Sequence, residues 1–114
     1  TNLTTGNAKV TFHMPFAMTL TAVKATVTTA PVGSTIIVDI EEAGATILTT
    51  LLTIDASEFS GGSAGVTHTA AADAVIGGAG PALADNALMI INIDQIGSST
   101  AGKGLKVWLY GYRA

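Results

Sequence analysis

The sequence predicts an all-β protein, an antiparallel β-sandwich of seven to eight strands, and three observations favour it. Threonine, valine and isoleucine, which are stiff at χ1 and suit a pleated sheet, recur along the whole chain. Apolar and polar residues alternate over several runs, and turns rich in Gly or Pro separate these runs. Apolar spacing of three and four, typical of helices, occurs only in the Ala-rich residues 70–87, where Pro81 and several glycines allow a short helix at best.

The first two strands are expected at residues 8–12 and 17–29, after an N-terminal arm of residues 1–7. The first strand ends before Pro15, because proline lacks the N–H group that a β-ladder requires. In the second strand, alternation assigns three residues to each face. One face carries Val23, Ala25 and Val27, and the other carries Lys24, Thr26 and Thr28.

Two further strands are expected at residues 35–42 and 46–54. Pro31 and Gly33 favour a turn before the first of them, and residues 42–45 form the hairpin turn between the two. The residues of these strands expected to point inward are Ile36, Val38, Ile40, Leu48, Leu52 and Ile54. Ile47 and Leu51 leave both faces of the second strand partly apolar, which indicates a covered outer face or a subunit contact.

Residues 59–87 form a long connection rich in Gly and Ala, with short strands expected at residues 66–69 and 74–76. The last two strands are expected at residues 88–96 and 105–112. Met89, Ile91 and Ile93 share one face of the former strand. The long connection favours a jelly-roll type of sandwich over an immunoglobulin-like one. An immunoglobulin domain has a cysteine pair and a tryptophan in an early strand, whereas this chain has no cysteine and its tryptophan, Trp108, lies in the last strand.

Composition predicts a single domain, residues 1–114, that associates with other protein. A chain of this length buries roughly 65% of its unfolded surface without needing disulfides. Only 11% of its residues are charged, against about 25% in an ordinary soluble domain. The net charge of −3 argues against a nucleic-acid partner, which requires a basic stripe. The mean hydropathy is high (+0.52), but no apolar run approaches the roughly 20 residues that cross a bilayer, so no membrane partner is expected.

No catalytic residue, cofactor or metal site is predicted, and we expect that the protein is not an enzyme. Asp39 and Glu41 share a strand face, and Asp94 lies near them if their strands pair. A Ca²⁺ site or a paired-carboxylate glycosidase are the alternatives for these residues, but outward positions on half-exposed strands explain them better. His13 and His68 lack the sequence motifs of nucleophilic catalysis and are expected to be structural or exposed.

Aromatic residues mark the candidate interaction surface. Trp108, Tyr110 and Tyr112 fall on one face of the last strand, where they could belong to the core or cover the sheet, anchor an interface, or stack on sugars. The full set of residues expected at an interface is Trp108, Tyr110, Tyr112, Phe59, Ile47 and Leu51. The nearby cations are Lys103, Lys106 and Arg113, which suffice to contact an acidic surface but make no nucleic-acid footprint.

Several segments resemble a β-sandwich module of tailed-bacteriophage virion proteins, found in capsid decoration (cement) and tail-fibre proteins. The resemblance covers most of the chain from about residue 12 onward and is weakest at residues 61–80. The segments that carry it are residues 18–25 (MTLTAVKA), 30–40 (APVGSTIIVDI), 53–58 (TIDASE), 83–86 (LADN), 91–97 (INIDQIG) and 102–114 (GKGLKVWLYGYRA). The resemblance implies a sandwich, often of jelly-roll type, in virion surface proteins that tend to be homotrimers, and it implies no catalytic residues.

These expectations combine into one functional hypothesis and one alternative. We expect a homotrimeric capsid decoration protein, located on the virion, that bridges capsomers through contacts with the major capsid protein or other virion proteins. The alternative is a receptor-binding or tail-fibre tip module that recognises glycans on the host surface.

Overall fold

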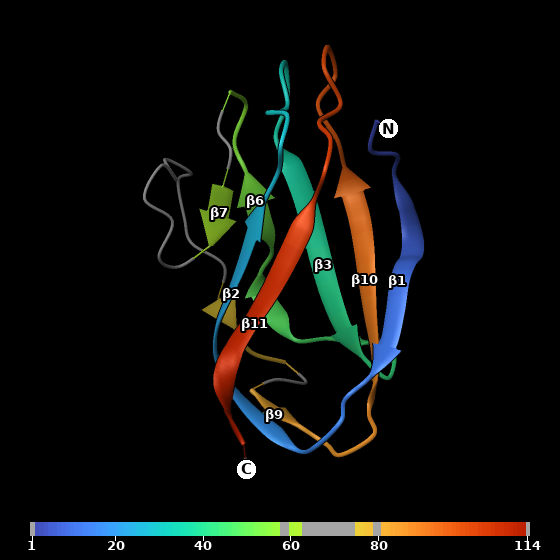
Figure 1. Cartoon of the computed structure of the whole chain (residues 1–114), viewed down its shortest axis with the longest axis vertical. Helices are drawn as coiled ribbons and strands as arrows, with labels where there is room; N and C mark the ends of the chain where they lie inside the picture. Colours follow the sequence, from blue (N-terminus) through green and yellow to red (C-terminus); the bar gives the residue numbers. More distant parts are fainter. Residues whose placement is uncertain (1, 58–59, 63–74, 79–80, 114) are drawn as a thin grey trace.

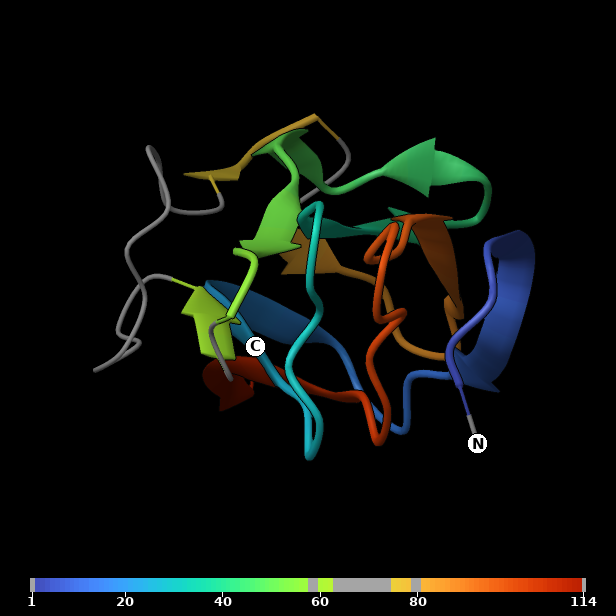
Figure 2. The same ribbon diagram turned by 90° about the horizontal axis from the view of Figure 1, so that it is seen from above.

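The computed structural model describes residues 2–57, 60–62, 75–78 and 81–113, and within these ranges the chain is all-β. Two antiparallel sheets face each other, as Figures 1 and 2 show from two directions. The predicted antiparallel β-sandwich is therefore confirmed. No helix in the described part of the chain is long and apolar enough to cross a membrane.

The first sheet is built on three long strands in the order β1, β10, β3. These strands are β1 (Gly6–His13), β10 (Leu88–Gln95) and β3 (Ile36–Glu42). Two short strands, β4 (Ala45–Thr46) and β6 (Leu52–Ile54), share the remaining edge of β3. This sheet is thus four strands wide, with β1 at its outer edge.

The second sheet is built on β11 (Lys106–Arg113) and β2 (Met18–Thr26). Two short strands, β7 (Ser60–Gly62) and β9 (Ala82–Leu83), share the other edge of β2. This sheet is three strands wide, with β11 at its outer edge. A separate pair, β5 (Leu48–Thr50) with β8 (Val75–Ile76), lies beside the sandwich.

The core forms between the two sheets, and the alternation in the sequence located it correctly. The residues assigned to inner faces in the two long central strands, β2 and β3, are buried, as are those of β10. They are Val23, Ala25, Val27, Ile36, Val38, Ile40, Met89, Ile91 and Ile93. The expected arm at residues 1–7 is tied down, because the Leu3 N–H donates to the Gly102 carbonyl and β1 already begins at Gly6.

The strand predicted at residues 46–54 is wrong as a single element, because the structure divides it into β4, β5 and β6. The cause is a bend at Ile47, whose N–H donates to the Ile40 carbonyl and whose carbonyl accepts from Gly77. Ile47 lies between β4 and β5, and it and Leu48 are both buried. The strand expected at residues 66–69 lies outside the described residues, and β7 and β9 were not expected.

The strand order leaves the predicted jelly-roll topology unestablished. We count β4–β6 as one interrupted strand and leave out the two-residue strands β8 and β9, which gives seven strands in chain order: β1, β2, β3, β4–β6, β7, β10 and β11. In this count the second strand (β2) neighbours the fifth (β7), and the third (β3) neighbours the sixth (β10). These inner pairings also occur in immunoglobulin-type sandwiches. The first strand (β1) pairs with the sixth (β10), and the last (β11) pairs with the second (β2). A nested jelly-roll order instead pairs the first strand with the last.

Candidate interaction surface

The last strand presents a row of aromatic side chains on the outside of the sandwich. Trp108, Tyr110 and Tyr112 are 40%, 43% and 61% exposed, respectively. Trp108 lies directly opposite Lys24 and Tyr110 opposite Ala22, and both partners alternate with the buried residues Val23 and Ala25 of β2. Directly opposed residues point to the same side of a sheet, so these two rings face away from the core.

A bulge keeps the third ring in the same row. The register of β2 and β11 shifts between Tyr110 and Gly111, so that β2 contains one additional residue there. Beyond the bulge Tyr112 pairs with Thr19, the neighbour of the buried Leu20. Tyr112 therefore remains on the outer face. Of the alternatives open for these aromatics, the structure excludes a role in the core.

Cations accompany the aromatic row. The Lys24 ammonium lies over the Tyr110 ring, 5.6 Å from its centroid, and the Arg113 guanidinium lies 4.9 Å from the centroid of the Phe16 ring. Both distances allow a cation–π attraction. Lys106 is exposed at the start of β11. We call the outer surface made by Lys24, Lys106, Trp108, Tyr110 and Tyr112 the aromatic–basic face.

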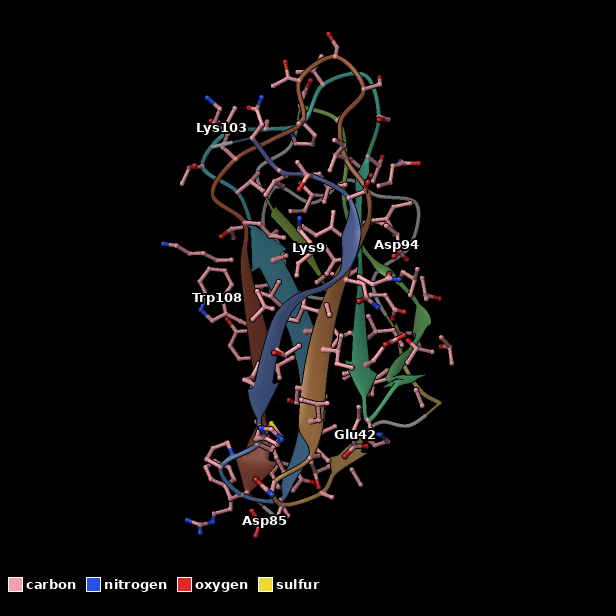
Figure 3. All side chains as sticks on the ribbon, turned by 90° about the vertical axis from the view of Figure 1, so that its right-hand side faces the viewer. Lys9, Glu42, Asp85, Asp94, Lys103 and Trp108 are labelled. Atoms are coloured by element: carbon pink, nitrogen blue, oxygen red, sulfur yellow. The ribbon has the colours of Figure 1, made fainter. Side chains whose placement is uncertain are left out.

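The strands that carry cations differ from those that carry the described carboxylates. All five cations lie on β1, β2, β11 or the loop before β11, and they are Lys9, Lys24, Lys103, Lys106 and Arg113. Of the described carboxylates, Asp39, Glu41 and Glu42 lie on β3 and Asp94 lies on β10. Asp55 follows β6, and Asp85 lies in the turn between β9 and β10. In Figure 3, Lys103 and Trp108 lie on one side of the molecule, and Glu42 and Asp94 on the other. The aromatic–basic face thus carries no carboxylate from its own two strands.

The structure does not place the other residues expected at an interface, Ile47, Leu51 and Phe59, in the aromatic row. The expectation for Ile47 is wrong, because its side chain is fully buried in the core and cannot meet a partner. Leu51 is half-buried and packs against the core, which leaves little of it for a contact. Phe59 lies outside the described residues. The aromatic row is therefore the part of the predicted surface that the structure places together.

Carboxylates on the first sheet have structural partners. The strands of Asp39 and Asp94 do pair, as required for these residues to approach, with Asp39 opposite Asn92. Asp39 accepts a hydrogen bond from the Thr46 hydroxyl at 2.5 Å, and Glu42 accepts one from the Ala84 N–H at 2.8 Å. No group of three His, Asp or Glu residues within the described ranges is arranged to hold a metal ion. His13 is exposed, and His68 falls outside those ranges.

Sequence reasoning missed Lys24 as a member of the surface. The alternation had assigned Lys24 to the polar face of its strand, but only the pairing of β2 with β11 brings its ammonium group over the Tyr110 ring. These two strands lie at opposite ends of the chain, so no local signal could have joined them. Comparison of the chain with protein-family models, with curated proteins and with solved structures finds no match.

Proposed function

We propose that the protein is a non-enzymatic structural subunit of a bacteriophage virion, a homotrimeric capsid decoration protein that bridges capsomers. The observation that supports this proposal is the aromatic–basic face, which exposes three large rings in a row beside cations. Aromatic residues and arginine are enriched in protein–protein interfaces, and they dominate the binding energy there. Covering about 100 Å² of such apolar surface contributes about 2.5 kcal/mol.

The arrangement suits a permanent contact with another protein. Trp108 and Tyr110 are fixed on a paired strand, so little conformational freedom is lost when a partner covers them. The adjacent cations favour a partner surface that offers carboxylates, because opposite charges steer the partners and set their register. The scarcity of charge elsewhere leaves few ionised groups to be desolvated when copies and capsomers pack together.

The decisive experiment compares phage particles with and without the protein. Particles lacking it are expected to release DNA at a lower temperature than intact particles, and re-addition of the purified chain should restore heat resistance. Re-addition of Trp108→Ser with Tyr110→Ser should not restore it, whereas Val75→Ser should, since Val75 is 49% exposed but lies on β8, away from the face. Equal heat resistance with and without the protein would refute a cementing role.

The proposed trimer has its own test. Sedimentation equilibrium should show a species three times the mass of the chain at micromolar concentration. A protein that stays monomeric at every concentration up to that of an assembled shell would contradict the trimer, irrespective of the result with particles.

A second function, glycan recognition in a tail fibre, is favoured by the same rings. Three exposed aromatics at alternate positions of one strand offer a platform on which sugar rings stack. Binding to a glycan array that is lost in Trp108→Ser would support this alternative over decoration. A virion copy number of a few to tens, instead of hundreds, would support it as well.

A further inference from the structure

The two sheets differ in width by one strand, and the difference falls at a defined place. β6 packs against β7 and β2, so these short strands align at one side of the sandwich. Counting across each sheet from there, β3 corresponds in position to β2, and β10 corresponds to β11. β1 is the fourth strand of the first sheet and extends beyond β11 (Figure 2).

Within the described ranges, no strand of the second sheet therefore covers the inner face of β1. Val10 lies directly opposite Ile91, which is buried in the core, so the Val10 side chain points to the inner side of the sheet. Even so, Val10 is 52% exposed. Phe12, opposite the fully buried Met89, is only half-buried. Apolar side chains at inward positions that remain exposed indicate that a covering strand is missing.

The neighbouring edge offers the backbone groups that a covering strand requires. Among the described residues β11 pairs with β2 alone, so half of its N–H and C=O groups point away from the sheet. Its central residues, 107–110, contain neither a charge nor a proline that would discourage pairing. Val107 and Leu109 point inward there and are only half-buried.

We propose that the free edge of β11 accepts one extended segment of a different protein chain, in which apolar residues alternate with carboxylates. Its inward side chains would lie beside Val107 and Leu109 and beneath Val10, which requires them to be apolar. Its outward side chains would lie beside Lys106 and Trp108, on the side of the sheet where Lys24 also lies and where β2 and β11 supply only positive charge. Charge complementarity therefore selects Asp or Glu at those positions.

A second whole copy does not fit this edge. Suppose that β11 paired with β11 of another molecule. In each copy β1 extends beyond β11, so it would then lie over the partner's β11. That space is already occupied by the partner's β10, the strand at the corresponding position of the partner's first sheet. The space beside β11 is one strand wide, about 4.8 Å. The proposal does not depend on a virion, so it can fail or succeed separately from the decoration role.

The test uses three synthetic decapeptides as probes: alternating Val–Glu, alternating Val–Lys, and a block peptide with all Val before all Glu. Trp108, the single tryptophan of the chain, reports binding through its fluorescence. The alternating Val–Glu peptide should bind at least tenfold more tightly than either of the others. It should also slow hydrogen exchange of amides in β11. Equal affinity for all three peptides, or no binding at millimolar concentration, would overturn the proposal.

Variants locate the site. Val10→Lys places a charge where the bound segment must be apolar and should weaken Val–Glu binding at least tenfold. Val75→Lys is the matched control, equally exposed on a distant strand, and should stay within twofold of the parent protein. Lys106→Glu should shift the preference toward the Val–Lys peptide. If Val10→Lys leaves peptide binding unchanged and instead dissolves a self-associated species, the occupant is a segment of another copy and the proposal is wrong.

Discussion

At the scale of single residues, Asn92 shows how the irregular part of β1 is held. Its side chain is buried on the outer side of β10, and its Oδ1 accepts a hydrogen bond from the Ala8 N–H at 2.7 Å. Ala8 has a positive φ of 53°, and the register between β1 and β10 shifts between Gly6 and Val10. The Asn92 side chain thus pairs with a backbone donor that the bulge removes from the ladder.

We expect Asn92→Ala to lower the free energy of unfolding by about 1–3 kcal/mol, because the Ala8 N–H loses its acceptor in a partly buried site. Urea denaturation measures the change, and hydrogen exchange of the Ala8 amide should become faster. Ile90→Ala serves as the control, since Ile90 is on the same face of β10 and makes no such bond. If both variants affect the Ala8 amide equally, the hydrogen bond is not what holds the bulge.

The turn between β3 and β4 contains a residue that does not suit its backbone. Ala43 and Gly44 both have positive φ, 52° and 90°, as a type I′ turn requires. Asn adopts this conformation more readily than Ala, so Ala43→Asn should stabilise the protein by about 0.5–1 kcal/mol. Thermal unfolding measures the gain. Ala45→Asn, at an exposed position whose φ is not positive, should give none, and an equal gain in both would refute the explanation.

At the scale of elements, the aromatic–basic face depends on a close approach between two strands. A Cβ atom at Gly111 would collide with the Thr19 carbonyl oxygen and would lie 3.0 Å from the Leu20 Cα. These are backbone atoms of β2 at the bulge, so they cannot move aside without breaking the pairing. The glycine therefore allows β11 to stay paired to the end of the row, where Tyr112 lies.

Gly111→Ala should destabilise the protein by about 1–3 kcal/mol, as overpacking typically does, and should loosen the end of β11. Hydrogen exchange is expected to accelerate for residues 110–113 and for their partners in β2, more than elsewhere. Gly6→Ala is a suitable control, because a Cβ there meets only the flexible end of the Lys9 side chain. Uniform acceleration along the whole chain would show that the effect is not local to the bulge.

The elements also show what the sequence could predict. Period-two alternation located β2, β3 and β10 and their buried faces, because one face of each lies on the core and the other does not. It failed at Ile47, since a bend changes which face is buried and leaves no mark in the alternation. β7 and β9 are too short for any periodic signal. The aromatic row was visible as a pattern, but its exposure and its contact with Lys24 depend on strand pairing across the chain.

At the scale of the whole molecule, the separation of charge matters more than the small net charge. The chain carries a net charge of −3, yet the cations on its strands lie on β1, β2 and β11, and the described carboxylates on its strands lie on β3 and β10. Opposed patches of this kind create local potentials that a uniform surface of the same net charge would not have. Such a molecule should interact with a charged partner through one face and should orient itself as it does so.

This separation predicts that the protein is retained on a sulfonate cation exchanger at pH 7 and low ionic strength, despite its negative net charge. Lys24→Glu with Lys106→Glu should abolish retention, because it reverses the charge beside the aromatic row. Lys9→Glu with Lys103→Glu changes the net charge by the same amount but leaves that face intact, and should elute later than the first variant. Because exposed charges are screened beyond about 8 Å at 0.15 M salt, retention of the parent protein should fall steeply as salt is raised toward that value. Identical elution of the two double variants would show that net charge alone decides and that the aromatic–basic face does not act as a unit.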